Sequence, residues 1–166
     1  VYRLKKEGLR NIPDEGAAVL VCNHVSFVDA LVIAAGCPRP IRFVMDHNIF
    51  KVPLLNFVFR TAKTIPIASA KEDSQALERA YDEVAKALKD GDRVGIFPEG
   101  KITSTGDMNE FKSGIKRIID RTPVPVIPLA LRGLWGSFFS RMGGKAMSRF
   151  FQRGISSKIE LAAGAP

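Results

Sequence analysis

The chain has 166 residues, and its 25 Lys and Arg against 17 Asp and Glu give it a formal net charge of +8. This length favours one domain, and the charge favours anionic partners such as phospholipid surfaces, an acidic carrier protein, nucleotide phosphates or nucleic acid. Two cysteines are too few for a disulfide framework, and no apolar run reaches the ~18 residues of a membrane-spanning helix.

Strand and helix patterns alternate along the chain. In order, we expect a strand at 17–22, a helix at 29–35, a strand at 41–45, a helix at 53–62, a strand at 64–68, a helix at 74–89, a strand at 93–97, a helix at 111–120, and strands at 124–131 and 157–161. Pro125 and Pro128 place the strand at 124–131 at an edge of the sheet or on an irregular course. The alternation predicts an α/β fold with a mostly parallel central sheet and helices on its faces.

The segment Asn23-His24-Val25-Ser26-Phe27-Val28-Asp29 joins the first predicted strand to the first predicted helix. An imidazole accepts a hydroxyl proton near neutral pH, and a carboxylate on its other nitrogen sets its tautomer. Ser26 and Asp29 also have the spacing of a helix capping box. The two roles are compatible, because a helix that starts at Ser26 aims Asp29 back at His24.

Other candidate groups have competing interpretations. Cys22 is either a nucleophile on the same side of the strand as His24 or, more commonly, a buried core cysteine. His47 lies in a polar turn, where we favour a surface role. The scattered His and Cys residues show no zinc-ligand spacing, so the sequence predicts no metal site.

A second signature, Phe97-Pro98-Glu99-Gly100-Lys101, follows the strand at 93–97. Gly100 permits a tight turn that can aim backbone N–H groups at an anion or an oxyanion. Glu99 and Lys101 are candidates to hold the polar groups of an acceptor. The alternative is a plain loop with solvated charges.

The segment 122–158 contains no Asp or Glu, whereas it carries six Lys or Arg residues. Aromatic residues alternate with this positive charge from Trp135 to Arg153. Either this stretch contacts a membrane surface or its aromatic rings cover the sheet. No nucleic-acid-binding signature is evident.

Together, the two signatures resemble the glycerolipid acyltransferases typified by bacterial 1-acylglycerol-3-phosphate acyltransferase. The first family motif, N-H-x-S-x-x-D, matches Asn23, His24, Ser26 and Asp29, and the F-P-E-G motif matches 97–100. A third, proline-containing element matches 124–128. The chain departs from the family where Lys101-Ile102-Thr103 replaces T-R-S, and where 64–71 lacks an arginine. At these positions the chain resembles the 2-acylglycerophosphoethanolamine acyltransferase subgroup.

The resemblance implies a glycerol-3-phosphate acyltransferase-like fold and transfer of a fatty acyl group from acyl-carrier protein or acyl-CoA to the hydroxyl of a lysophospholipid. His24 would be the general base, and Asp29 would orient it. The implied substrate-binding residues are Asn23, Ser26, Glu99, Gly100, Lys101 and Thr103. No metal, redox cofactor or nucleic-acid partner is implied.

The expected location is the cytoplasmic face of a membrane, either peripheral or tethered through segments outside this chain. We expect residues 1–166 to be a single acyltransferase domain within a longer protein. Two alternatives use the same residues differently: a non-catalytic basic lipid-binding module, and a hydrolase in which His24 and Asp29 activate water on an acyl thioester.

Overall fold

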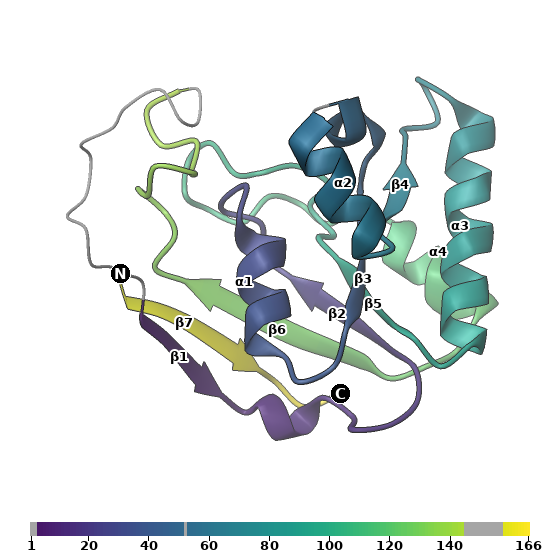
Figure 1. Cartoon of the computed structure of the whole chain (residues 1–166), viewed down its shortest axis with the longest axis horizontal. Helices are drawn as coiled ribbons and strands as arrows, with labels where there is room; N and C mark the ends of the chain where they lie inside the picture. The colour runs from purple at the N-terminus through teal and green to yellow at the C-terminus, as the bar shows by residue number, and fades with distance from the viewer. Residues whose placement is uncertain (1–2, 52, 145–157) are drawn as a thin grey trace.

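The computed structural model describes residues 3–51, 53–144 and 158–166. Its centre is a seven-stranded sheet in the order β1-β7-β6-β2-β5-β3-β4 (Figure 1). The strands are β1 (Arg3–Glu7), β2 (Ala18–Cys22), β3 (Ile41–Asp46), β4 (Ile65–Ile67), β5 (Arg93–Ile96), β6 (Val126–Arg132) and β7 (Lys158–Ala163). The α-helices are α1 (Asp29–Gly36), α2 (Pro53–Thr61), α3 (Ser74–Lys89) and α4 (Gly114–Arg121), with 3-10 turns η1 (Leu9–Asn11) and η2 (His47–Lys51).

The sheet is mostly parallel, as predicted. Among the described strands, β6 and β7 form the antiparallel pair and the other five pairings are parallel. The carboxyl ends of β2, β3, β5 and β6 therefore meet at one edge of the sheet, which we call the carboxyl edge. In parallel α/β sheets the segments that leave this edge build the functional site.

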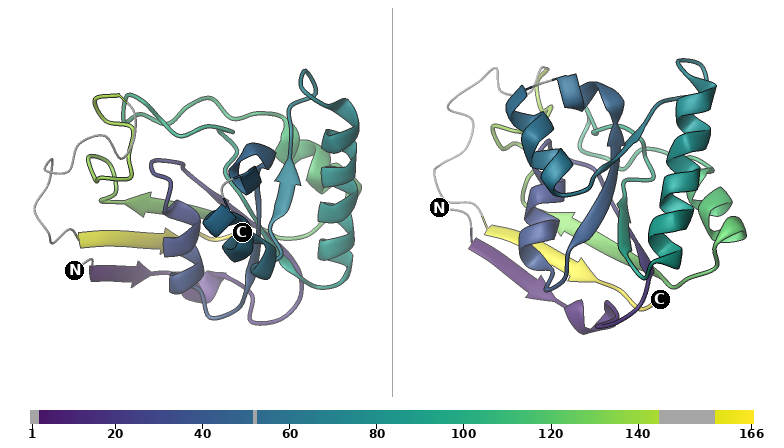
Figure 2. Two further views of the ribbon diagram at one scale, coloured as in Figure 1. Left: turned by 45° about the horizontal axis from the view of Figure 1, so that its top comes forward. Right: turned by 45° about the vertical axis from the view of Figure 1, so that its right-hand side comes forward.

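Helices pack on both faces of the sheet and divide the core in two. On one face, Ala30 and Ile33 of α1 pack with a cluster that includes Leu20 and Leu161. On the other face, α3 and α4 bury their apolar stripes against β2, β4 and β5. Helix α2 lies beside α1 in each of the three views (Figures 1 and 2).

The apolar patterns located most elements well, and α3 has the predicted bounds. Asp73 caps this helix by accepting a hydrogen bond from the Ala76 N–H at 2.8 Å. Strand β1 was not predicted. Its Arg-Leu-Lys-Lys-Glu sequence is mostly charged and exposed, so only its pairing with β7 reveals it as a strand.

The prediction of an edge position for the proline-containing strand is wrong, because β6 lies between β7 and β2. Pro128 is tolerated there because a backbone N–H at this position would point toward the end of β7, where no acceptor of the ladder requires it. Its carbonyl accepts from the Gly164 N–H at 2.8 Å, so its nitrogen also faces the side of β7. Strand β7 ends at Ala163, and the ladder does not need a donor from Pro128.

Part of the basic, aromatic stretch lies outside the described residues, namely 145–153. In the described part, Trp135, Phe138 and Phe139 are half-buried, whereas Met142 is exposed. Within the described ranges, no helix has both the length and the apolar character needed to cross a bilayer.

Candidate active site

His24 and Asp29 are in direct contact at the carboxyl edge. Nδ1 of His24 lies 2.9 Å from Oδ2 of Asp29, and the Asp29 side chain is fully buried. A carboxylate only accepts hydrogen bonds, so Nδ1 carries the proton and Nε2 keeps its lone pair. The His24 side chain retains 20% exposure, which leaves the ring open to an acceptor.

The turn between β2 and α1 holds Asp29 in place. Oδ2 of Asp29 also accepts from the N–H groups of Val25 at 2.7 Å and Ser26 at 2.9 Å. The buried Ser26 hydroxyl accepts from the Val28 N–H at 3.1 Å, just before α1 begins. Half of the predicted capping box therefore forms, namely the bond from the Ser26 N–H to the Asp29 carboxylate. In the other half, the Ser26 hydroxyl bonds to the N–H of Val28 and not to that of Asp29, which the standard pattern would require.

Phe97 supports the imidazole ring from one side. The two ring centroids are 4.1 Å apart and their planes differ by 17°, and Phe97 also stacks with Phe43 at 6.0 Å. The first residue of the second signature thus restricts how the imidazole ring can tilt.

Glu99 joins the two signatures. Its carboxylate is 2% exposed, and Oε1 accepts from the His24 N–H at 2.8 Å. Oε2 accepts from the Asn109 N–H at 2.7 Å and from the Asn109 side-chain amide at 2.9 Å. Glu99 therefore positions the backbone of His24, and Asn109, which no sequence signal identified, holds Glu99.

Thr103 completes this connection. Its N–H donates to the His24 carbonyl at 3.0 Å, and its buried hydroxyl accepts from the Gly106 N–H at 3.0 Å. Between Glu99 and Thr103 the chain turns at Gly100, whose φ is +66°. A Cβ on Gly100 would lie 2.7 Å from Nζ of Lys112, so the Lys112 side chain lies directly over this turn.

Asn23 connects β2 to β6 at the same edge. Its side-chain amide donates to the Leu131 carbonyl at 2.9 Å, and its oxygen accepts from the Leu131 N–H at 2.8 Å. The Asn23 side chain thereby makes the two hydrogen bonds to β6 that a backbone peptide group of a neighbouring strand would make.

These contacts revise the roles of several predicted site residues. Asn23, Ser26, Glu99 and Thr103 already have protein partners, and the last three are buried. These bonds give the four side chains a positioning role, and substrate contact by them stays a prediction. Gly100 lies in the backbone turn, and the Lys101 side chain is exposed to solvent; substrate contact by these two stays a prediction.

Cys22 does not have the setting of a nucleophile. Burial raises the pKa of its thiol well above the ordinary value, and the nearby Asp29 carboxylate raises that pKa further. Its sulfur lies 3.5 Å from the Asn23 side-chain oxygen. A reactive thiol needs the opposite surroundings, so the structure favours the core-cysteine interpretation.

His47 lies apart from this cluster, at the end of β3. Single ligand atoms of Asp46, His47 and Glu72 all lie within 4.8 Å of one another, so these three residues are a group with the donors for a divalent cation. All three are exposed or half-buried, and acidic surface groups commonly have this arrangement without an ion.

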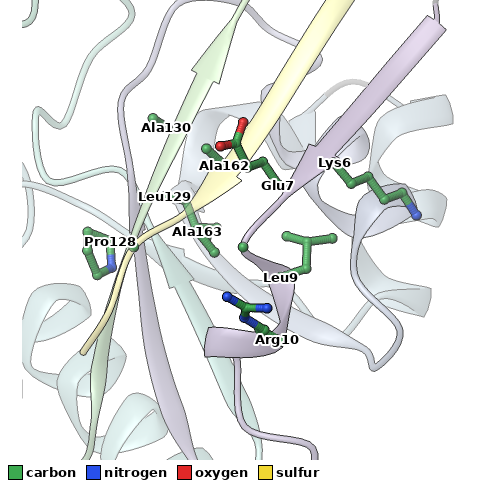
Figure 3. Close-up of a pocket in the computed structure, with 11 residues that line it drawn as sticks. Lys6, Glu7, Leu9, Arg10, Pro128, Leu129, Ala130, Ala162 and Ala163 are labelled. Carbon is green, nitrogen blue, oxygen red and sulfur yellow. The ribbon is translucent and has the colours of Figure 1, made fainter.

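The structure also contains a cavity of about 830 Å³ whose lining does not include His24 (Figure 3). It is formed where β1 and β7 end, beside Pro128, Leu129 and Ala130 of β6, and the Arg10 side chain reaches into the same region. None of the predicted site residues lines this cavity.

A comparison with protein families identifies the class of this domain. The family model described as Acyltransferase matches residues 3–132, which include both signatures and the strands that carry them. These elements define an α/β acyltransferase domain. The chain belongs to the glycerolipid acyltransferase family, and the resemblance seen in its motifs is confirmed.

Similar proteins carry names from the same family. The chain is 30% identical over 135 residues to a chloroplast 1-acyl-sn-glycerol-3-phosphate acyltransferase of Arabidopsis thaliana, covering 80% of this chain and 36% of the relative. It is 27% identical to a 1-acyl-sn-glycerol-3-phosphate acyltransferase of Borreliella burgdorferi, covering 75% of this chain and 49% of the relative. The chain thus spans less than half the length of these two relatives.

One solved structure has a similar fold. The crystal structure of the 1-acyl-sn-glycerophosphate acyltransferase of Thermotoga maritima matches with a TM-score of 0.73 and 24% sequence identity, over 99% of this chain and 60% of that chain. This similarity supports the predicted fold class.

Proposed function

We propose that this domain is an O-acyltransferase that moves a fatty acyl group from an acyl thioester to the free hydroxyl of a lysophospholipid. The observation that carries the proposal is the contact between His24 and Asp29, in which Nδ1 is held and Nε2 is left to accept a proton. Membership of the glycerolipid acyltransferase family supports the reaction class.

In the proposed step, Nε2 of His24 takes the proton of the acceptor hydroxyl as its oxygen attacks the thioester carbonyl. The new C–O bond gives a tetrahedral oxyanion, whose collapse breaks the C–S bond. The imidazolium then returns the proton to the leaving thiolate. Asp29 stabilises the transient positive charge on His24, and no acyl-enzyme is needed.

The donors for the oxyanion do not come from the turn that carries His24. The N–H groups of residues 24 to 28 all have partners, including Glu99, Asp29 and the Phe139 carbonyl. The adjacent segment contains free donors, because within the described residues the N–H groups of Lys101 and Ile102 meet no acceptor. We assign the oxyanion to these two groups, which Gly100 and Thr103 position.

For the acceptor headgroup we propose a phosphate that is recognised by lysine. Lys101 follows Gly100 in the chain, and the Lys112 side chain lies over Gly100. Lysine offers a point charge, whereas arginine offers a bidentate fork that suits a phosphate monoester. A phosphodiester headgroup carries one negative charge, so it is compatible with this arrangement.

The proposed donor is acyl-carrier protein or acyl-CoA, both of which are anionic and complement the net charge of +8. We place the enzyme at the cytoplasmic face of a membrane. The free thiols of Cys22 and Cys37 are compatible with a reducing compartment.

The test supplies a labelled acyl thioester with a panel of lysophospholipids that differ in headgroup, and it separates the lipid products from free fatty acid. Transfer of label to one or more lysophospholipids supports the proposal. Release of free fatty acid alone would instead indicate the thioester hydrolase. Binding of lipid without turnover of any donor would indicate the non-catalytic lipid-binding module.

A further inference from the structure

The exposed large apolar side chains of the described residues share a position in the topology of the fold. All of them lie on segments that leave the carboxyl ends of β2, β3, β5 and β6, the same edge that carries His24. They are Phe27, Leu31, Phe57, Val58, Met108, Phe111 and Met142. Phe57 is 72% exposed, an unusual state for a phenylalanine on a folded helix.

Five of these side chains lie on neighbouring segments, whose exposed surface we call the interfacial face: Phe27, Leu31, Phe57, Val58 and Met142. Helices α1 and α2 lie side by side in each view (Figures 1 and 2). The loop at 133–144 is attached to the start of α1, because the Phe27 N–H donates to the Phe139 carbonyl at 3.1 Å and Ser26 bridges to Ser140. Three separate segments therefore contribute to this face.

The exposed charges on two of these segments are positive, although the exposed acids Asp46 and Glu72 lie beside the start of the first. Lys51, Arg60, Lys63 and Arg141 are exposed there, and the segments 47–63 and 133–144 contain no Asp or Glu. Lys51 and Arg60 hydrogen-bond to the neutral amide oxygens of Asn48 and Asn56, so these contacts leave their positive charge uncompensated. Exposed apolar side chains within a basic rim are the chemistry that binds the surface of an anionic bilayer.

We propose that the interfacial face docks on a phospholipid bilayer that contains anionic lipids, with the apolar side chains in the interface and the four cations at the lipid phosphates. This inference rests on the proposed function for its purpose, because docking would bring the His24 edge to the membrane that holds both the lysophospholipid and its product.

The loop that follows Glu99 provides a matched control. Met108 and Phe111 are 63% and 52% exposed, but the exposed acids Asp107 and Glu110 lie next to them. A double substitution Leu31→Ser/Phe57→Ser removes apolar area from the interfacial face. A double substitution Met108→Ser/Phe111→Ser removes a comparable exposed pair from a region with mixed charge.

The experiment measures flotation of the protein with phosphatidylcholine vesicles, with and without phosphatidylglycerol, and checks each variant by its melting temperature. We expect wild type to float with the anionic vesicles, the Leu31/Phe57 variant to bind them roughly tenfold more weakly or worse, and the Met108/Phe111 variant to bind like wild type. Equal binding by all three proteins, or equal loss in both variants, would overturn the proposal.

A kinetic measurement distinguishes a membrane from a protein as the partner of the interfacial face. With wild-type flotation established, the Leu31/Phe57 variant should lose transfer to lysophospholipid presented in vesicles and keep transfer to a water-soluble, short-chain lysophospholipid. A variant that still floats but has a raised KM for acyl-carrier protein, and not for acyl-CoA, would show that the face docks the carrier and would overturn the membrane assignment. Flotation needs no turnover, so it answers this question even if the enzyme assay with wild type fails.

Discussion

The backbone N–H of His24 donates to Oε1 of Glu99 at 2.8 Å, although 75 residues separate the two. This contact unites the two sequence signatures, because β2 and β5 are neighbours in the sheet and both end beside it. Oδ2 of Asp29 holds the imidazole ring of the same histidine. One carboxylate thus positions the backbone of His24, and the other positions its side chain.

Replacing Glu99 by Gln should lower both stability and kcat. Each oxygen of Glu99 faces at least one N–H donor, so the amide NH₂ of Gln would leave a buried backbone N–H without an acceptor. We expect a loss of about 1–3 kcal/mol of unfolding free energy, measured by chemical denaturation, and a fall in kcat at little change in KM. Glu110→Gln, on the exposed surface of the same loop, is the control and should change neither quantity.

Replacing Asp29 by Asn should lower kcat by ~10²–10⁴-fold, because the imidazolium loses its counter-charge. The new NH₂ would also occupy the position of Oδ1, which is buried and has no partner among the described residues. Steady-state acyl transfer is the measurement, and Asp46→Asn, beside the other histidine, is the control. Similar rates for the two variants would remove Asp29 from the mechanism.

Replacing Gly100 by Ala should reduce acyl transfer, because the substitution disturbs the backbone turn at residue 100. Alanine disfavours a φ of +66° by about 1–2 kcal/mol, and its Cβ would meet the Lys112 side chain. Gly91 has a φ of +86° with open space around it, so Gly91→Ala carries a comparable backbone cost far from the site. We expect both variants to lose stability and only Gly100→Ala to lose activity. Equal activity in the two would contradict a role for the 100–102 turn at the oxyanion.

Cys22 should resist alkylation in the folded protein, and Cys22→Ala should keep acyl transfer within a few-fold of wild type. The raised pKa of the thiol keeps it protonated at pH values where a free cysteine ionises. Because that pKa lies higher in the folded chain, the unfolded chain loses its proton first, and unfolding free energy should decline as pH rises above about 8.5. Cys22→Ala should remove this contribution, as pH-dependent denaturation would show.

The sequence predicted the parts of the site that are close in the chain. His24 and Asp29 are five residues apart across a strand-to-helix turn, so their contact follows from local geometry. The contacts of Glu99 with His24, and of Asn23 with Leu131, depend on which strands are neighbours, and the order of strands has no local signal. Asn109 was missed because an asparagine in a loop has no distinctive pattern.

The fold was predicted to a similar degree. Apolar periodicity located the buried strands and α3, whereas β1 was hidden because four of its five residues are charged. Pro128 led to the wrong prediction of an edge position for β6, since the sequence alone does not show that β7 ends beside the missing N–H donor. Residues whose role depends on a partner strand are therefore the ones that need the structure.

The proposed role of His24 as general base is tested by comparing His24→Ala with His47→Ala in acyl transfer from one thioester to one lysophospholipid. Both substitutions remove an imidazole at the carboxyl edge, but only His24 is held by a buried carboxylate. Our expectation is that kcat falls by ~10²-fold or more in His24→Ala and stays near wild type in His47→Ala, with both proteins folded. A folded His24→Ala protein that transfers acyl groups at the wild-type rate would contradict it.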